Sequence, residues 1–234
     1  MLRSLVLFAL CLPVLVLADG LPSSPYIEVN GHGELHVAPD LAYVNLTLEK
    51  TSMDAKAARA DVEARAAKVI ALARQLGIAD KDIKAPAITV YPQYDWHQTS
   101  SGDGKQVLVG QHVTRSISLT LRDLSRYGAL ADGLFAAGVT RLDDVVPDRS
   151  DRDQLQQQAL AQAVRDAHGK AEALAAAASV ALGAVYRISE QEGSRGPRPM
   201  MMAAARGAGN QEPEFLSGEI EIDADVAAYY LIGH

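Results

Sequence analysis

The chain contains very little cysteine, since Cys11 is the single one among 234 residues. It lies in an apolar run from Ser4 to Leu17, which follows the positively charged Arg3 and is too short to span a bilayer comfortably. A basic start, a short apolar run and small residues before a polar segment are typical of a cleaved export signal. We therefore predict cleavage after about Ala18, so that residues 1–18 are a signal peptide. The mature chain 19–234 then has no disulfide, no cysteine nucleophile and no cysteine-ligated metal.

A second membrane segment is not expected, because no stop-transfer pattern follows the apolar leader. A lipoprotein signal would need a small residue directly before the cysteine, and Leu10 is not one. Export together with a cysteine-free mature chain favours the bacterial periplasm, with envelope association as an open alternative. The formal net charge of −7 argues against nucleic acid and against an anionic membrane surface as partners.

Signatures of common enzyme classes are also missing. The chain has no G-x-S-x-G motif, and no serine stands in a recognisable order with a histidine and an acid. Gly31 and Gly33 lie inside an expected strand, whereas a phosphate-binding glycine loop precedes a helix. No pair of acids is singled out for glycosidase chemistry. We therefore expect a non-enzymatic protein without a cofactor, and an unrecognised hydrolase stays open as a third class.

What the chain does contain is an alternation of two hydrophobic periods. Steps of two predict strands, and steps of three and four predict helices. The strand from Tyr26 to Val37 is expected to pair with the alternating segment 42–48 through a turn at Ala38-Pro39-Asp40. Further strands are expected over 83–96, 106–122, 143–147, 185–190 and 220–231, and helices over 55–76, 124–137 and 151–182. Ser150 is the expected N-cap of the last helix, and Gly77 and Gly138 are expected to end the first two.

This order predicts an α+β fold, with an antiparallel or mixed sheet and helices packed on one side. The longest helix carries alanine at every fourth position, which suits close approach to a sheet. Those alanines are Ala159, Ala163, Ala167, Ala171 and Ala175. The element order also suggests two similar sheet-and-helix halves, with sub-halves 26–122 and 123–234.

Several stretches, taken in order along the mature chain, carry a family resemblance. They are the apolar strand 27–33 with its G-x-G, the Pro-Asp turn within 37–42, the alanine-rich helix 159–175, and the closing segments 182–185 and 217–220. Together they resemble the SIMPL-domain family of bacterial periplasmic proteins, which includes periplasmic immunogenic and oxidative-stress-associated members. The resemblance implies an envelope protein that forms rings or other homo-oligomers, with a loose link to stress tolerance. It implies no active site, because the family has no agreed catalytic residues.

Two sets of residues invite a metal-binding interpretation. His32, Glu34 and His36 alternate on one face of the first strand, but the two histidines lie about 13 Å apart on an unbulged strand, too far to share one zinc. We therefore favour a solvent-facing strand. Thioethers bind Cu(I) and are oxidised reversibly, so a run of three methionines in a loop rich in Gly and Pro suggests copper binding or oxidant scavenging. Packing of these methionines against a neighbouring subunit is the favoured alternative, and the residues are Met200, Met201 and Met202.

A cluster of aspartates precedes the longest helix and suggests calcium as a ligand. Its spacing lacks the glycine and the terminal glutamate of a calcium loop, and Arg149 and Arg152 can supply counter-charge from within. We favour a charged helix start. The aspartates are Asp143, Asp144, Asp148, Asp151 and Asp153.

The closing strand carries four carboxylates on one face, while its apolar residues point the other way. They are Glu219, Glu221, Asp223 and Asp225. An ordinary solvated face explains them as well as an assembly face that meets basic residues of a neighbour, for which Arg115, Arg122 and Arg126 are candidates. The sequence thus favours a self-assembling periplasmic protein. A module that binds a small ligand or metal between sheet and helices is the alternative.

Overall fold

The computed structural model of the chain describes residues 24–98, 104–191, 198–199 and 218–233. The expected signal peptide with Cys11 and the three methionines at 200–202 lie outside these residues.

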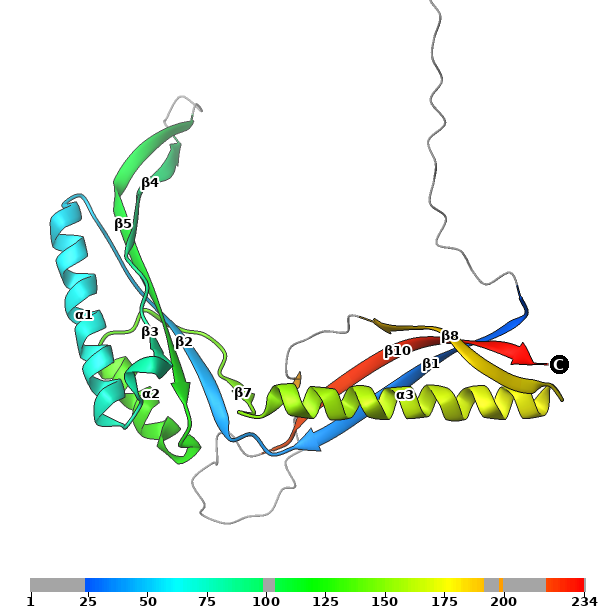
Figure 1. The fold of residues 1–234 in the computed structure, drawn as a ribbon. Coiled ribbons are helices and arrows are strands. Elements are labelled where there is room, and N and C mark those ends of the chain that lie inside the picture. The colour runs from blue at the N-terminus through cyan, green and yellow to red at the C-terminus, as the bar shows by residue number, and fades with distance from the viewer. Residues whose placement is uncertain (1–23, 99–103, 192–197, 200–217, 234) are drawn as a thin grey trace, which may run out of the picture.

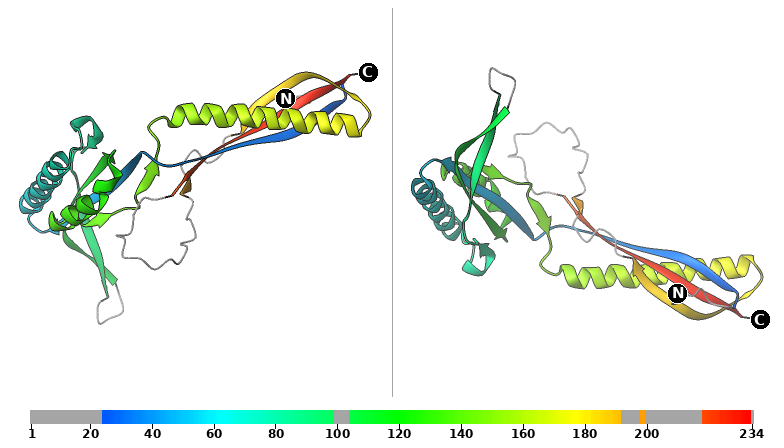
Figure 2. Two further views of the ribbon diagram at one scale, coloured as in Figure 1. Left: turned by 90° about the horizontal axis from the view of Figure 1, so that it is seen from below. Right: turned by 90° about the horizontal axis from the view of Figure 1, so that it is seen from above.

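Two β-sheets, each covered by helix on one face, make up the fold (Figures 1 and 2). All pairings among the described strands are antiparallel, which confirms the predicted α+β class. The elements in chain order are β1 (Tyr26–Val37), β2 (Leu41–Ser52), α1 (Ala55–Gln75), η1 (Asp80–Asp82), β3 (Ile83–Lys84), β4 (Thr89–Gln98), β5 (Gly104–Leu121), η2 (Leu124–Arg126), α2 (Tyr127–Ala136), β6 (Arg141–Leu142), β7 (Val146–Asp148), α3 (Arg152–Ala177), β8 (Ala181–Gln191), β9 (Arg198–Pro199) and β10 (Ile220–Gly233).

The β10 sheet consists of β1, β10 and β8 in that order, with β9 also on β10. Helix α3 covers one of its faces through the alanine stripe, whose five residues are all buried. Two glycines of β1 allow this approach: a Cβ atom on Gly31 would lie 2.0 Å from the carbonyl oxygen of Ala163, and one on Gly33 would lie 2.0 Å from that of Ala159. The G-x-G is therefore a packing element between strand and helix.

The β5 sheet pairs β5 with β2 over eleven registered residue pairs, from Ala42 with Leu121 to Ser52 with Gln111. Strands β3 and β4 also pair with β5, and β6 and β7 pair with β2. Helix α1 packs a stripe of small apolar residues onto the two central strands, and α2 adds Leu130 and Leu134 to the same core. The stripe of α1 consists of Ala58, Val62, Ala66, Val69 and Ala73.

The expected hairpin between β1 and β2 is wrong. Strand β1 pairs instead with β10, from Tyr26 with Leu231 to Val37 with Ile220, and the two strands joined at 38–40 enter different sheets. The sheets therefore do not follow consecutive sub-halves 26–122 and 123–234, because residues 41–148 form one sheet-and-helix unit between the two parts of the other. A short connection cannot be told from a tight turn when both flanking strands alternate.

Two segments connect the sheet-and-helix units, residues 38–40 between β1 and β2 and residues 149–151 between β7 and α3, and hydrogen bonds join them. The backbone N–H and the hydroxyl of Ser150 both donate to the Asp40 carboxylate, at 2.7 and 2.6 Å. Ser150 is therefore not the N-cap of α3: residue Asp151 occupies that place. The predicted counter-charge is confirmed, since Arg149 pairs with Asp151 at 2.8 Å and Arg152 pairs with the buried Asp148 at 3.0 Å.

Two predicted elements were too long. Helix α3 ends at Ala177 rather than near residue 182, because Ser179 takes a left-handed conformation (φ 55°) and the Val180 N–H donates to the Ala175 carbonyl. The expected strand 83–96 is split, because the carbonyls of Ala85 and Pro86 accept from the Arg115 guanidinium between β3 and β4.

Candidate functional site

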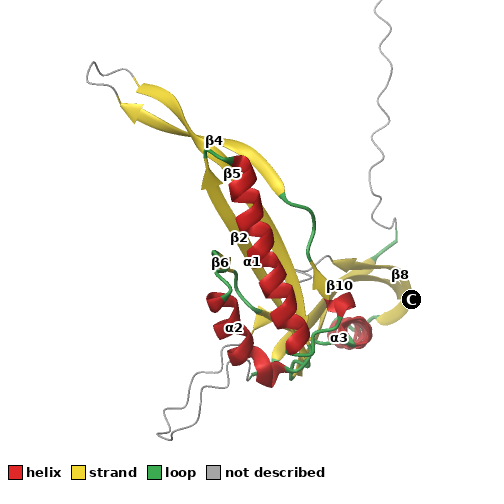
Figure 3. Ribbon diagram, turned by 90° about the vertical axis from the view of Figure 1, so that its left-hand side faces the viewer, coloured by secondary structure: helices red, strands yellow, loops and turns green. Residues whose placement is uncertain are grey.

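Strands β4 and β5 continue past the rest of their sheet as a two-stranded arm, which we define as residues 93–98 and 104–110 (Figures 1 and 3). Strand β2 ends opposite Gln111. At the base of the arm Gly110 has a φ of 156°, and a Cβ atom there would lie 2.6 Å from the Ser52 carbonyl carbon. Beyond that point, in the part of the chain that the structure describes, each strand of the arm has only the other as a neighbour.

The arm exposes large apolar side chains on both of its faces. Their relative exposures run from 38% at Leu108 to 62% at Trp96. A lone two-stranded hairpin is marginally stable in water, and contiguous exposed apolar residues mark an interaction surface. The exposed set comprises Tyr94, Trp96, Val107, Leu108 and Val109.

A second feature is the face of the β10 sheet that points away from α3. Cross-strand register sets His32 opposite Asp225, Glu34 opposite Asp223 and His36 opposite Glu221. The apolar residues of β10 that alternate with these acids are buried beneath α3. Three of the predicted assembly-face carboxylates, those of Glu221, Asp223 and Asp225, therefore share the open face. Glu219 lies one residue before β10 and is exposed.

Hydrogen bonds order the histidines on this face. The His32 imidazole donates from Nδ1 to Asp225 at 2.8 Å, and its Nε2 lies 3.5 Å from Glu34. Nε2 of His36 contacts the other oxygen of Glu34, so one carboxylate lies between both rings. The hydrogen bond to Asp225 is the main cause that raises the pKa of His32 above its ordinary value. Protonation of the His32 ring would offset part of the negative charge of the face.

The other predicted site residues are placed as follows. Among the residues with described positions, no three His, Cys, Asp or Glu side chains are arranged to hold a metal ion. The candidate basic partners of the acidic face already bind within their own chain: Arg115 to two backbone carbonyls, Arg122 to Asp82 at 3.0 Å and Arg126 to Asp123 at 2.7 Å.

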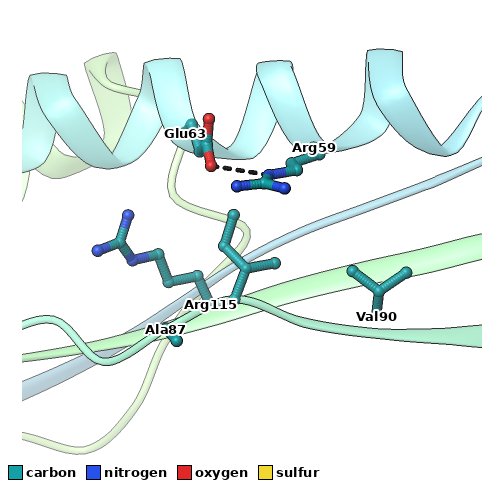
Figure 4. Close-up of a pocket in the computed structure, with 6 residues that line it drawn as sticks. Arg59, Glu63, Ala87, Val90 and Arg115 are labelled. Carbon is teal, nitrogen blue, oxygen red and sulfur yellow. Dashed lines mark hydrogen bonds and ion pairs between the residues drawn. The ribbon is translucent and has the colours of Figure 1, made fainter.

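A cavity of about 310 Å³ lies between α1 and the base of β4 (Figure 4). Its polar lining comes from Arg59, Glu63 and Arg115. The first two form an ion pair at 2.9 Å, and Arg115 donates to the chain between β3 and β4. The volume falls at the lower end of the range of small-molecule sites.

Sequence reasoning predicted the two strands that form the arm, within 83–96 and 106–122, but did not predict that they project beyond their sheet. The signal that could have found it is the run Val107-Leu108-Val109, which breaks the alternation seen later in β5. The greater length of β5, 18 residues against 12 in β2, also leaves part of it unmatched. A strand with one buried face alternates, whereas consecutive apolar residues place apolar groups on both faces.

No helix in the described ranges is both long and apolar enough to cross a membrane.

Comparison with known proteins places the chain in a family. The “Uncharacterized protein YggE” of Escherichia coli (strain K12) is 28% identical over 211 residues, which cover 89% of this chain and 84% of that protein. The protein of the same name from Edwardsiella ictaluri is 29% identical over 197 residues, covering 84% and 81%. The “26 kDa periplasmic immunogenic protein” of Brucella melitensis biotype 1 is 29% identical over 196 residues, covering 83% and 78%. The family model described as “SIMPL: Protein of unknown function (DUF541)” matches residues 27–230, and the chain therefore belongs to the SIMPL family.

Proposed function

We propose that this protein is exported, loses its leader after about Ala18 and acts in the periplasm as a non-enzymatic, self-assembling protein. The name of the Brucella relative, a periplasmic immunogenic protein, supports the compartment. The leader pattern supports the export step.

The observation that carries self-assembly is the arm. It combines exposed aromatic and aliphatic side chains with strand edges that have no neighbour among the described residues. Such edges pair with other chains unless they are protected by charge, proline or a covering segment. A protein that keeps this element in water without aggregating must cover it, and copies of the same chain are the simplest cover.

Light scattering on the exported, purified protein tests assembly. We expect a mass of several chains, and a monomer across the accessible concentration range would refute the proposal. A monomer would favour the alternative function, a small-ligand module built on the cavity beside Arg59 and Arg115. Saturable binding of a small molecule that is lost in the Arg115→Ala variant would then support that alternative.

The acidic open face is a second proposed contributor to assembly. Glu34 and Asp223 face each other as like charges, which costs stability unless protons, counter-ions or a neighbour offset them. Changing Glu221 and Asp223 to lysine should alter the oligomer mass while circular dichroism stays native-like. The matched control changes Asp132 and Glu172, exposed acids on α2 and α3, in the same way. Equal effects of both pairs would mean that net charge, and not this face, governs assembly.

The family resemblance adds a link to envelope or oxidative stress tolerance. A strain without the gene should survive hydrogen peroxide less well, and the parent protein should restore survival. A variant that folds but does not assemble should fail to restore it. Equal restoration by both proteins would separate stress tolerance from assembly.

A further inference from the structure

We infer that the arm of one copy adds as a strand to the edge of the β10 sheet in the next copy, with β5 residues 105–109 pairing antiparallel with β8 residues 186–190. This inference rests on the proposed self-assembly and names its two surfaces. The arm and β8 belong to different sheet-and-helix units in Figures 1 and 2, so that each copy offers both.

The arm has two edges, and they differ in protection. The β4 edge carries Asp95 and His97, and Pro92 at the base of the arm has no N–H to give to a neighbouring strand. The β5 edge carries Lys105 near its outer end and then Gln106, Val107, Leu108 and Val109, which include neither proline nor charge. Natural edges that avoid pairing carry such devices, so the β5 edge over 106–109 is the one suited to pair with another strand.

The β10 sheet also has two edges, and only one is covered by described residues. On the β1 side, the Asp166 carboxylate of α3 accepts the His32 N–H at 2.8 Å, and Lys170 donates to the Asn30 carbonyl at 3.0 Å. On the other side, β8 has β10 as its one neighbouring strand in the described chain. It also exposes 49% of Val185, 50% of Tyr186 and 44% of Ile188.

One antiparallel register joins the two edges with matching chemistry on one face of the extended sheet. It sets Lys105 opposite Glu190 and Val107 opposite Ile188. The same register sets Val109 opposite Tyr186. Each of these two residues lies at a register shift within its own sheet. Val109 lies where the pairing with β4 shifts between Gln93 and Tyr94, and Tyr186 lies where the pairing with β10 shifts between Tyr229 and Tyr230.

Other alignments lose this complementarity. A shift of two residues one way sets Lys105 opposite Ile188, and the opposite shift sets Val107 opposite Glu190. A parallel pairing centred on Val107 and Ile188 sets Lys105 opposite Tyr186. The charge pairing and the apolar pairing therefore select the same register.

The contact joins two different surfaces of the same chain, so it is heterologous. Contacts of this kind generate a closed ring when the rotation between copies closes, and an open filament when it does not. Strand addition also supplies the arm with the third strand that a lone hairpin needs for stability.

Mixed cross-linking tests the pairing. In a full-length chain with Cys11→Ala, copies with Val107→Cys and copies with Ile188→Cys are exported, purified and mixed, then treated with an oxidant or a short bis-maleimide. We expect a covalent dimer only in the mixture. A control mixture with Ser189→Cys in place of Ile188→Cys should give at least about 5-fold less, because neighbouring strand residues point to opposite faces. Dimers formed by Val107→Cys copies alone would overturn the inference in favour of arm-to-arm contact.

Charge reversal gives an independent readout with exposed residues that do not threaten folding. Lys105→Glu and Glu190→Lys should each raise the concentration for half-maximal assembly about 3- to 10-fold, and the double variant should restore it. Lys84→Glu, an exposed lysine of β3, is the matched control. A parent protein that does not assemble refutes the proposed function itself. A parent that assembles without cross-links and without the charge effect refutes only this pairing.

Discussion

Replacing Gly33 with alanine adds one methyl group at one of the two tightest contacts between β1 and α3. The new Cβ atom would lie 2.0 Å from the carbonyl oxygen of Ala159 and 2.7 Å from the backbone N of Ala163. Real Cβ atoms keep at least 3.0 Å from other heavy atoms, so α3 must retreat by at least about 1 Å. Both obstructing atoms belong to the helix backbone, so no side-chain rotation can make room.

The cost follows from what the retreat separates. The alanine stripe of α3 is buried along its whole length, and a gap of 0.5–1 Å forfeits about a quarter to a half of each dispersion contact. Overpacking of a close-packed core costs about 1–3 kcal/mol, sometimes more. Because the obstacle here is backbone, we expect Gly33→Ala to lower the free energy of unfolding by about 3 kcal/mol or more.

The same substitution at Gly169 should have the opposite sign. Gly169 lies within α3, and a Cβ atom there meets nothing within 4 Å. Alanine is favoured over glycine in a helix by about 0.8–1.0 kcal/mol, so Gly169→Ala should stabilise the protein by a similar amount.

Urea unfolding followed by circular dichroism at one protein concentration measures both variants. The packing argument would be refuted if the urea midpoints of Gly33→Ala and Gly169→Ala moved in the same direction. It would also be refuted if Gly33→Ala lowered the free energy of unfolding by less than about 1 kcal/mol.

Three further predictions concern charge and the methionines. Because the pKa of His32 is raised, its protonated form contributes stability that is fully present below about pH 6.5 and is lost as pH rises through the folded-state pKa. Asp225→Asn should lower the pKa of His32 in an NMR titration. An unchanged pKa would contradict the hydrogen bond to Asp225 as its cause. The Arg122 guanidinium lowers the pKa of the buried Asp82 carboxyl, so the contribution of ionised Asp82 to stability is present above about pH 4 and is lost as pH falls. Asp82→Asn should therefore flatten the acid side of the profile of unfolding free energy against pH, measured by urea titrations. An unaltered slope would contradict this contribution of Asp82. Leucine at all three positions 200–202 should leave the circular dichroism and the unfolding midpoint unchanged, and a loss of copper binding or peroxide protection that the parent shows would favour the scavenging function.

Local signals in the sequence predicted the elements well where one residue type fixes the backbone. Gly77 and Gly138 end α1 and α2 with positive φ values of 80° and 83°, as expected for helix C-terminal glycines. Ser179 ends α3 in the same conformation with a side chain that rarely adopts it, so no local signal marked that end.

The candidate site was also predictable from the sequence only in part. Alternation of acidic and apolar residues in the closing strand predicted which face of β10 is open, because a strand has a period of two. It could not predict that His32, Glu34 and His36 stand opposite those acids, because the pairing of β1 with β10 joins segments that lie far apart in the chain. Nor could it show that Arg115, Arg122 and Arg126 bind within their own chain.

The sequence by itself determined the α+β class, the family and the apolar or polar character of each strand face, since these depend on composition and on periods within a single element. Only the tertiary structure decided the partner of each strand, the insertion of one sheet-and-helix unit within the other, and the projection of the arm beyond its sheet. Those features depend on contacts between residues far apart in the chain, where many pairings satisfy the same local pattern and the packing of Gly31 and Gly33 against α3 helps to select one.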